Sequence, residues 1–190
     1  MSSHEHTFAE RTQQFQSLLN TLHITNDQAA PLTTDQGHQQ ALELLRATRK
    51  NRNHVFLVGN GGSAGVAAHA TTDMSNLAKL RVMTLHESAL VTCLSNDFGY
   101  DQVFSKQLAN FADPGDLLIA ISSSGQSANI LNAATAIQQA GGQLITLSGF
   151  DADNPLRQQG NLNYWLDSHD YGMVEIAHLF ILHYLAEKVA

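Results

Sequence analysis

The sequence is poor in cysteine, proline and basic residues, and these shortages exclude several classes of protein. Its 190 residues contain one cysteine, three prolines, and ten lysines and arginines against seventeen acidic residues. The single cysteine, Cys93, has no second cysteine in the chain with which to form a disulfide, which fits a reducing compartment. The net charge of −7 at pH 7 argues against a nucleic-acid partner, because such partners need a basic surface.

Long apolar runs are also missing. No stretch approaches the roughly 20 apolar residues that cross a bilayer, and the start, Met1–His6, lacks the basic and apolar segments of a signal peptide. We therefore expect a cytoplasmic protein with no membrane partner. Cys93 stands in the apolar stretch Leu90–Leu94, so it is predicted to be a small core residue.

The length and the hydrophobic pattern predict one domain over residues 1–190. Apolar residues at helical spacing mark a first helix over about Thr7–Leu22, and a second runs from Thr33 to about Lys50. We expect these two helices, within residues 1–52, to precede the first strand of an α/β core over residues 53–190.

Apolar runs alternate with helical stretches along the rest of the chain. This alternation is typical of an α/β fold with a mostly parallel sheet, here five-stranded, and helices on both faces. The predicted strands are Val55–Val58, Val82–Leu85, Leu117–Ile121, Leu144–Leu147 and Leu162–Leu166. The predicted helices are Ala64–Leu77, Leu90–Phe98 with Val103–Phe111, Ile130–Ala140 and Gly172–Val189.

Two strand-to-helix turns are rich in glycine and serine. Gly59–Ser63 follows the first predicted strand, and Ser122–Ser127 follows the third. Glycine permits close backbone approach, serine hydroxyls donate hydrogen bonds, and a helix N-terminus attracts anions, so the pair predicts a site for a small phosphorylated metabolite. Gly59–Ser63 matches neither the P-loop nor the Gly-x-Gly-x-x-Gly dinucleotide motif, so no nucleotide cofactor is expected. The alternative is that both are ordinary turns.

Two helices carry polar residues that suit proton transfer or metal binding. His69 and Asp73 are four residues apart, which puts both on one helix face at a workable metal-ligand spacing. Glu175, His178 and His183 interrupt the apolar last helix, and polar groups in such a helix need partners. The alternatives are a solvated pair for the first set, and a helix rim or a hydrogen-bonded core histidine for the second.

In combination and order, four motifs resemble those of the sedoheptulose-7-phosphate isomerases, or phosphoheptose isomerases, of the sugar isomerase (SIS) domain superfamily. The motifs are Val58–Ser63, Ser95–Tyr100, Ile121–Ser127, and Glu175–His178 with His183. The resemblance implies a three-layer, flavodoxin-like SIS fold, a homotetramer with active sites between subunits, and a sugar-phosphate substrate. The implied reaction converts sedoheptulose 7-phosphate to D-glycero-D-manno-heptose 7-phosphate by enediolate proton transfer, for surface-polysaccharide synthesis.

The resemblance also implies roles for individual residues. Asp73 matches the catalytic base and His183 the acid, and together with His69 and Glu175 they match positions that bind zinc in some members. Asn96 and Asp97 match a segment that borders the active site, although a turn or helix cap would also explain them. The positions implied for substrate and phosphate binding are Asn60, Gly61, Gly62, Ser63, Asn96, Asp97, Ser122, Ser123, Ser124, Ser127 and Glu175.

Three positions depart from the family pattern. Asp73 replaces a longer glutamate, Glu175 replaces a glutamine, and Leu77 stands where many members have an arginine. A carboxylate that is one methylene shorter can lower the rate strongly, because errors near 1 Å cost roughly a hundredfold. Two alternatives therefore stay open: isomerisation of another ketose phosphate, and a non-catalytic SIS protein that senses a sugar phosphate or acts as an adaptor.

Overall fold

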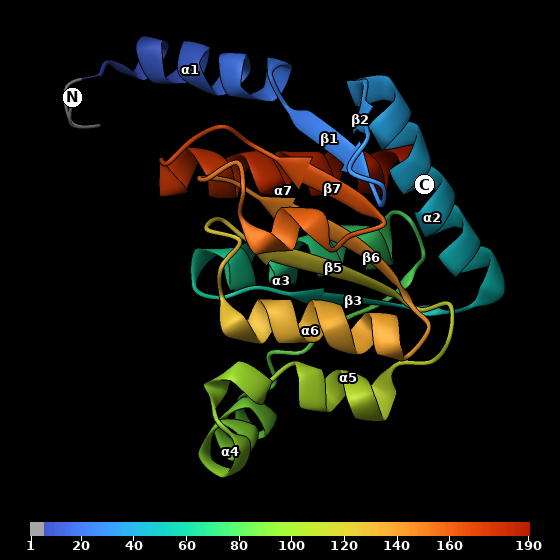
Figure 1. Ribbon diagram of the computed structural model, residues 1–190. Helices are drawn as coiled ribbons and strands as arrows, with labels where there is room; N and C mark the ends of the chain where they lie inside the picture. The colour runs from blue at the N-terminus through green and yellow to red at the C-terminus, as the bar shows by residue number, and fades with distance from the viewer. Residues whose placement is uncertain (1–5) are drawn as a thin grey trace.

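The computed structural model of the protein describes residues 6–190 and has a central sheet with helices on both faces (Figure 1). Residues 1–5, which begin the segment where no signal peptide is expected, lie outside this range. The strands are β1 (His23–Asn26), β2 (Pro31–Leu32), β3 (His54–Val58), β4 (Arg81–Thr84), β5 (Leu117–Ser122), β6 (Gln143–Ser148) and β7 (Leu162–Trp165). The helices are α1 (Phe8–Asn20), α2 (Thr34–Asn51), α3 (Gly62–Asn76), α4 (Ser88–Phe98), α5 (Ser105–Phe111), α6 (Ala128–Gln139) and α7 (Tyr171–Val189), with 3₁₀ turns η2 (Tyr100–Gln102) and η3 (Pro155–Gln158).

The five predicted strands form the parallel part of the sheet, in the order β4-β3-β5-β6-β7. This is the order of a flavodoxin-like fold, and the predicted α/β fold class is confirmed. The chain runs from β3 outward to β4 and then returns to β5 on the other side of β3. Ligands of such sheets bind where the strand order reverses, at the carboxyl ends of the strands, which here means the ends of β3 and β5.

The N-terminal part differs from the prediction, because two strands lie between α1 and α2. β1 pairs antiparallel with β7 and with the two-residue β2, which makes the sheet seven-stranded and mixed. Ile24 of β1 is buried in the main core. The expectation that two helices precede the first strand is therefore wrong. Pairing with β7 covers a sheet edge that would otherwise expose unpaired backbone groups.

Side chains of alternate strand residues enter two different cores. In β3, Val55 and Leu57 pack in the core that includes α2, α3 and α7, whereas Phe56 and Val58 pack in the core with α5 and α6. Successive side chains of a strand point to opposite faces, and both faces are covered here. The helices on both faces are thus confirmed, and α3 and α7 share one face.

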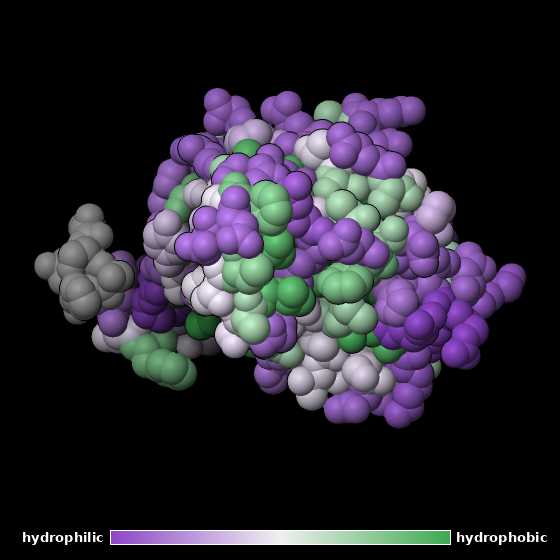
Figure 2. Space-filling view, turned by 90° about the horizontal axis from the view of Figure 1, so that it is seen from below, coloured by the Kyte–Doolittle hydropathy of each residue, from purple (hydrophilic) through white to green (hydrophobic). Residues whose placement is uncertain are grey.

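α4 lies at the outer surface, and none of its residues is buried. Cys93 is exposed there, so its predicted core position is wrong: Val91 and Leu94 are the residues of this stretch that pack against the core, and Cys93 faces outward. Figure 2, which views the molecule from below Figure 1, shows apolar side chains gathered amid hydrophilic ones on this face. Within residues 6–190, no helix combines the length and the apolar content that a bilayer crossing requires.

Candidate active site

The N-termini of α3 and α6 lie at the ends of adjacent strands and have no side-chain cap. Gly61 and Ser127 are the N-cap residues, and neither makes a side-chain capping hydrogen bond. Helices α1, α2, α4 and α7, by contrast, are capped by Thr7, Thr33, Glu87 and Asp170. Unpaired backbone N–H groups and the positive end of the helix dipole are therefore open to an anion at two neighbouring sites.

The loop that follows β5 presents several hydroxyls. The backbone N–H of Gly125 bonds to the Oγ of Ser122 at 3.2 Å, and Gly125 has a φ of +63°, which favours glycine. The Oγ atoms of Ser122 and Ser127 are 3.4 Å apart. The Oγ of Ser123 is buried and has no hydrogen-bond partner within the described residues. A buried hydroxyl without a partner is costly, so Ser123 is prepared to bond to a ligand.

These two turns enclose one cavity, which we call the serine cavity. Among residues 6–190, Glu175 is the only charged side chain that lines it, and no lysine or arginine does. The Glu175 carboxylate lies against Gly62, where an added Cβ would overlap it. The negative charge thus sits beside the uncapped N-terminus of α3, where the dipole favours it. The cavity is lined by Asn60, Ser63, Ile121, Ser122, Ser123, Ser124, Ser127, Tyr171 and Glu175.

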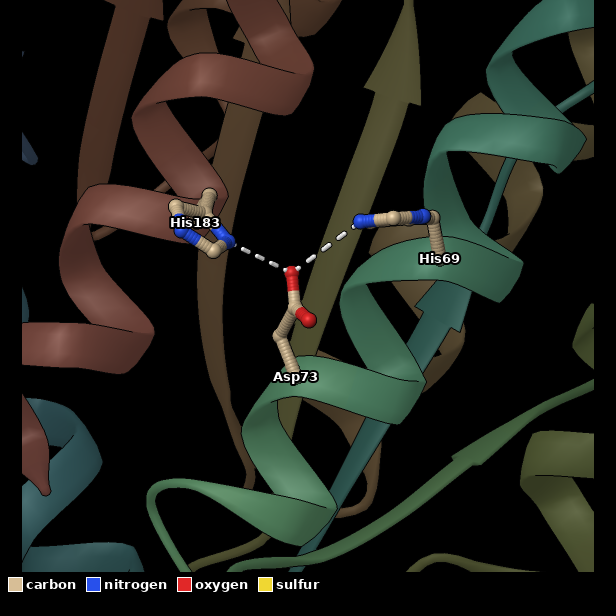
Figure 3. Close-up of side chains that lie close together, drawn as sticks. All are labelled: His69, Asp73 and His183. Atoms are coloured by element: carbon tan, nitrogen blue, oxygen red, sulfur yellow. Dashed lines mark hydrogen bonds and ion pairs between the residues drawn. The ribbon is translucent and has the colours of Figure 1, made fainter.

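A short hydrogen bond joins α3 to α7. The Nδ1 of His183 donates to the Oδ2 of Asp73 at 2.8 Å (Figure 3). The Asp73 side chain is 15% exposed and that of His183 is 44% exposed, so solvent and small molecules reach the pair. The hydrogen bond to Asp73 raises the pKa of His183 above its ordinary value, with a further increase from the charge of Glu187. An imidazolium beside a carboxylate is a common acid–base pair.

A second histidine points at the same carboxylate oxygen. The Nε2 of His69 lies 3.3 Å from the Oδ2 of Asp73. One ligand atom from each of His69, Asp73 and His183 lies within 4.8 Å of the other two, as in a group that can hold a metal ion. Glu175, which was predicted as a fourth ligand, does not belong to this group and lines the serine cavity instead. Two imidazole nitrogens and one carboxylate oxygen suit a three-ligand zinc site.

The serine cavity and the Asp73–His183 pair lie at opposite ends of two helices, α3 and α7, that run in the same direction. Ser63 on α3 and Glu175 on α7 line the cavity, and Asp73 and His183 meet further along the same helices. Ten residues separate Ser63 from Asp73, which is about 15 Å along a helix at 1.5 Å per residue. α3 and α7 therefore connect an anion site to a candidate acid–base pair.

Comparisons with known proteins agree with this arrangement. The SIS domain family matches residues 8–149, more than half of the chain. A phosphoheptose isomerase from Campylobacter concisus (strain 13826) is 34% identical over 156 residues, which cover 78% of this chain and 82% of the relative. One from Aliarcobacter butzleri (strain RM4018) is 33% identical over 158 residues, 80% of this chain and 82% of the relative. The chain belongs to the phosphoheptose isomerase family.

Solved structures of the phosphoheptose isomerase family share the fold. The enzyme from Neisseria gonorrhoeae superimposes with a TM-score of 0.78 at 25% identity, covering 95% of this chain and 91% of the other. The one from Francisella tularensis has a TM-score of 0.84 at 24% identity, covering 100% and 98%. The similarity extends over the N-terminal helices as well as the sheet.

Two residues of the family's Asn-Asp-Phe-Gly segment lie outside the cavity. Asn96 and Asp97 are exposed on α4, and the Nδ2 of Asn96 donates to the Oδ1 of Asp97 at 2.9 Å. Gly61 and Gly62, also predicted, form the backbone at the start of α3 and are exposed. Within this single chain, Asn96 and Asp97 are thus predicted substrate ligands that do not reach the cavity.

Four residues near the cavity were missed in the sequence analysis. Tyr171 lines the cavity, and Asn129 and the Tyr100 hydroxyl bond to Asn60. The Nε2 of His86 donates to the carbonyl of Gly59 at 2.9 Å, and burial lowers the pKa of this histidine. Tyr100 is the last residue of the family motif Ser95–Tyr100, and Asn129 stands two residues after the motif Ile121–Ser127. Their positions in or next to these motifs could therefore have identified both residues as candidates from the sequence.

Proposed function

We propose that this chain is a phosphoheptose isomerase that converts sedoheptulose 7-phosphate to D-glycero-D-manno-heptose 7-phosphate. The observation that carries the proposal is the 2.8 Å hydrogen bond between Asp73 and His183, at one end of a helix pair whose other end forms the serine cavity. An aldose–ketose isomerase needs a base, an acid and a fixed phosphate. Family membership supports the choice of a sugar phosphate.

The separation of the two ends supports a long sugar. An extended seven-carbon chain with its phosphate spans roughly 10 Å from phosphorus to C1 at bond lengths of about 1.5 Å. With hydrogen-bond contacts of about 3 Å at its end, such a molecule covers most of the roughly 15 Å between Ser63 and Asp73. A three-carbon sugar phosphate is about half as long, and would leave one end without a partner.

At the phosphate end, we assign binding to hydroxyls and backbone amides. Each uncapped helix N-terminus acts as about half a positive charge. The N-terminus of α3 already faces the Glu175 carboxylate, so that of α6 is the one left to favour the phosphate. The Glu175 carboxylate accepts hydrogen bonds from sugar hydroxyls in this proposal, because it is the one charged group lining the cavity. The hydroxyls that bond to phosphate oxygens are those of Ser63, Ser122, Ser123, Ser124 and Ser127.

At the other end, Asp73 acts as the base and His183 as the acid. Asp73 removes a proton from C1 of the open-chain ketose, and the electron pair forms the C1–C2 double bond of an enediolate. His183, as imidazolium, gives its proton to O2, whose charge rises as the carbonyl opens. Return of the proton from Asp73 to C2, with transfer of the O1 proton to His183, yields the aldose.

A zinc-loaded form of the same site is the alternative to the imidazolium: His69 and His183, both neutral, and the Asp73 carboxylate would hold the ion in place of the proton between Asp73 and His183. The donor set fits zinc, and a bound ion would polarise the substrate carbonyl as a Lewis acid. In the zinc-loaded form, protein purified without a chelator or a polyhistidine tag is expected to contain about one zinc per chain, and a His69→Gln variant less. Elemental analysis that finds no stoichiometric metal would remove the ion from the proposal.

We also propose a homotetramer in which the N- and C-terminal helices form contacts between subunits. Phe8 of α1, and Ile176 and Phe180 of α7, are 90%, 58% and 53% exposed. Phe15, Ile176, Leu179 and Phe180 line an apolar groove together with His69 and His183. A second copy seated on this groove would bury apolar surface and exclude water from the acid–base pair. Sedimentation equilibrium measures the assembly.

The central test is hydrogen exchange into sedoheptulose 7-phosphate in deuterated water, followed by NMR. The proposal requires deuterium at C1 of the ketose and at C2 of the aldose product. An Asp73→Asn variant should abolish the exchange, whereas an Asp27→Asn variant, altered at a turn remote from the site, should retain it. Equal exchange in the two variants would contradict the assignment of the base.

A non-catalytic phosphosugar-binding protein is the second candidate. The Asp73 carboxylate, one methylene shorter than in the family, and the apolar Leu77 in place of an arginine favour it. An Asp73→Glu variant separates the two. A catalytic site should change its exchange rate at least tenfold, because proton transfer depends on sub-ångström placement. A binding protein should show no exchange in either form and unchanged phosphate affinity.

A further inference from the structure

A side-chain network ties the first phosphate turn to α6 and η2. The Nδ2 of Asn60 donates to the Oδ1 of Asn129 at 2.9 Å, and the Nδ2 of Asn129 donates to the Oδ1 of Asn60 at 2.8 Å. The hydroxyl of Tyr100 donates to the same Asn60 oxygen at 3.0 Å. Three segments that are distant in the sequence therefore meet at one amide.

The network fixes which way the Asn60 amide faces. Its oxygen accepts two hydrogen bonds, and one of its two N–H groups is used by Asn129. If the Asn60 amide alone were rotated by 180°, its NH₂ group would face the NH₂ group of Asn129, and its oxygen would face the Asn129 oxygen. Asn129 is only 3% exposed, so it cannot replace the lost bonds with water.

One N–H of Asn60 has no partner among residues 6–190, and Asn60 lines the serine cavity. Asn60 stands between two glycines, and Gly61 has a φ of +52°. Such a turn has a large conformational freedom to lose on ordering. Anchoring the Asn60 side chain therefore lowers the entropy that the turn must give up when an anion binds.

We propose that Asn129 and Tyr100 are positioning residues that hold Asn60 with its free N–H available to the phosphate in the serine cavity. This inference rests on the anion site of the proposed function. It does not depend on the acid–base chemistry, which lies about 15 Å away along α3. It also gives Tyr100, in η2 directly after α4, a role in the site, whereas Asn96 and Asp97 on α4 stay exposed.

A residue of α6, Asn132, provides a matched control. It tests whether holding η2 against α6 is enough to support phosphate binding, without any contact to Asn60. Asn132, one turn after Asn129, donates to the backbone carbonyl of Asp101 at 2.9 Å and so fastens the same two segments. It does not line the cavity or bond to Asn60. If attachment alone matters, Asn132→Ala and Asn129→Ala should weaken phosphate binding equally.

The test measures binding of inorganic phosphate to the full chain by calorimetry, together with exchange kinetics. Loss of the single hydrogen bond from Asn60 to phosphate corresponds to roughly a fivefold effect. Tyr100→Phe and Asn129→Ala should each raise the phosphate Kd about fivefold, and Asn132→Ala less than twofold. KM for the sugar phosphate should rise similarly, and kcat should change less than twofold, because the chemistry lies elsewhere.

A double-mutant cycle decides whether the effect passes through Asn60. In an Asn60→Ala background, adding Tyr100→Phe should have no further effect on phosphate affinity. Additive losses would overturn the inference, as would equal losses in Asn129→Ala and Asn132→Ala. Absence of phosphate binding by the unaltered chain would overturn the inference together with the anion site. Phosphate binding with this coupling but without hydrogen exchange would support the inference and contradict the isomerase.

Discussion

Two histidines of α7, five residues apart, have opposite environments. His178 is fully buried, and its Nε2 donates to the carbonyl of Ser148 at 3.2 Å. His183 is partly exposed and bonds to Asp73. Burial lowers the pKa of His178 to about 4, whereas the hydrogen bond to Asp73 raises the pKa of His183. One helix thus holds a neutral structural histidine and a histidine that favours its charged form.

The helix geometry explains the difference. Five residues rotate an α-helix by about 500°, so the two side chains are about 140° apart around its axis. His178 points toward Ser148 at the end of β6, and His183 points toward α3. The role of each histidine therefore follows from what its helix face meets. Replacing the two residues in turn should separate chemistry from stability.

The largest expected effect is the loss of activity in His183→Gln. Removing a general acid lowers a rate by about 10²–10⁴, and the deuterium exchange of sedoheptulose 7-phosphate should fall by that factor. The thermal unfolding midpoint should change little, because the side chain is partly exposed. A large drop in stability with normal exchange would reverse the roles that we assign to the two histidines.

His178→Ala should have the opposite pattern. It leaves a cavity in the core and the Ser148 carbonyl without its donor, so the free energy of unfolding should fall by about 2–4 kcal/mol. Urea denaturation measures this value. Exchange per folded molecule should stay within a few-fold of the unaltered protein. The measurement is made below the onset of unfolding, so that activity is compared between folded chains.

Acid should destabilise the fold through His178. Above pH 6.5 neither the folded nor the unfolded chain protonates this residue, and its contribution to stability is complete. Between pH 6.5 and about 4 the unfolded chain takes up a proton that the folded chain does not, so stability falls with pH, by up to about 3 kcal/mol. Burial also lowers the pKa of His38 and His86, which adds to the same trend.

The contribution of His178 is isolated by comparing how steeply the free energy of unfolding depends on pH in the unaltered protein and in a variant. A His178→Leu variant cannot titrate at this position, so its stability should depend less steeply on pH between 6.5 and 4. His38 and His86 are unchanged in the variant and supply the matched background. Parallel curves for the two proteins would show that His178 is not held neutral in the fold.

Much of the fold could be predicted because the five parallel strands are short apolar runs that end in recognisable turns. Gly59–Ser63 and Ser122–Ser127 marked the end of β3 and the beginning of α6 through their glycines and serines. β1 and β2 could not be found in this way. They have four and two residues, too few to show a periodic pattern, and they form by pairing with β7, which is distant in the sequence.

The site was predictable only in part, for a similar reason. The spacing of His69 and Asp73 places both on one face of α3, but their contact with His183 depends on how α3 packs beside α7. The match at Ser95–Tyr100 identified a segment without identifying which of its side chains contacts a residue of the cavity. Tyr100 bonds to Asn60, and Asn96 and Asp97 stay on the surface. Tertiary packing decides such details.

The smallest expected effect comes from Glu187, one turn beyond His183. Its Oε1 lies 3.3 Å from the Nε2 of His183, and both groups are partly exposed. Exposed pairs of this kind contribute little to stability, because water screens them. Glu187→Gln should leave unfolding unchanged but lower the pKa of His183, by less than Asp73→Asn does, since the hydrogen bond to Asp73 is the main cause of the increase. NMR titration of the imidazole measures both shifts, and a larger shift in Glu187→Gln would mean that Asp73 is not the principal partner of His183.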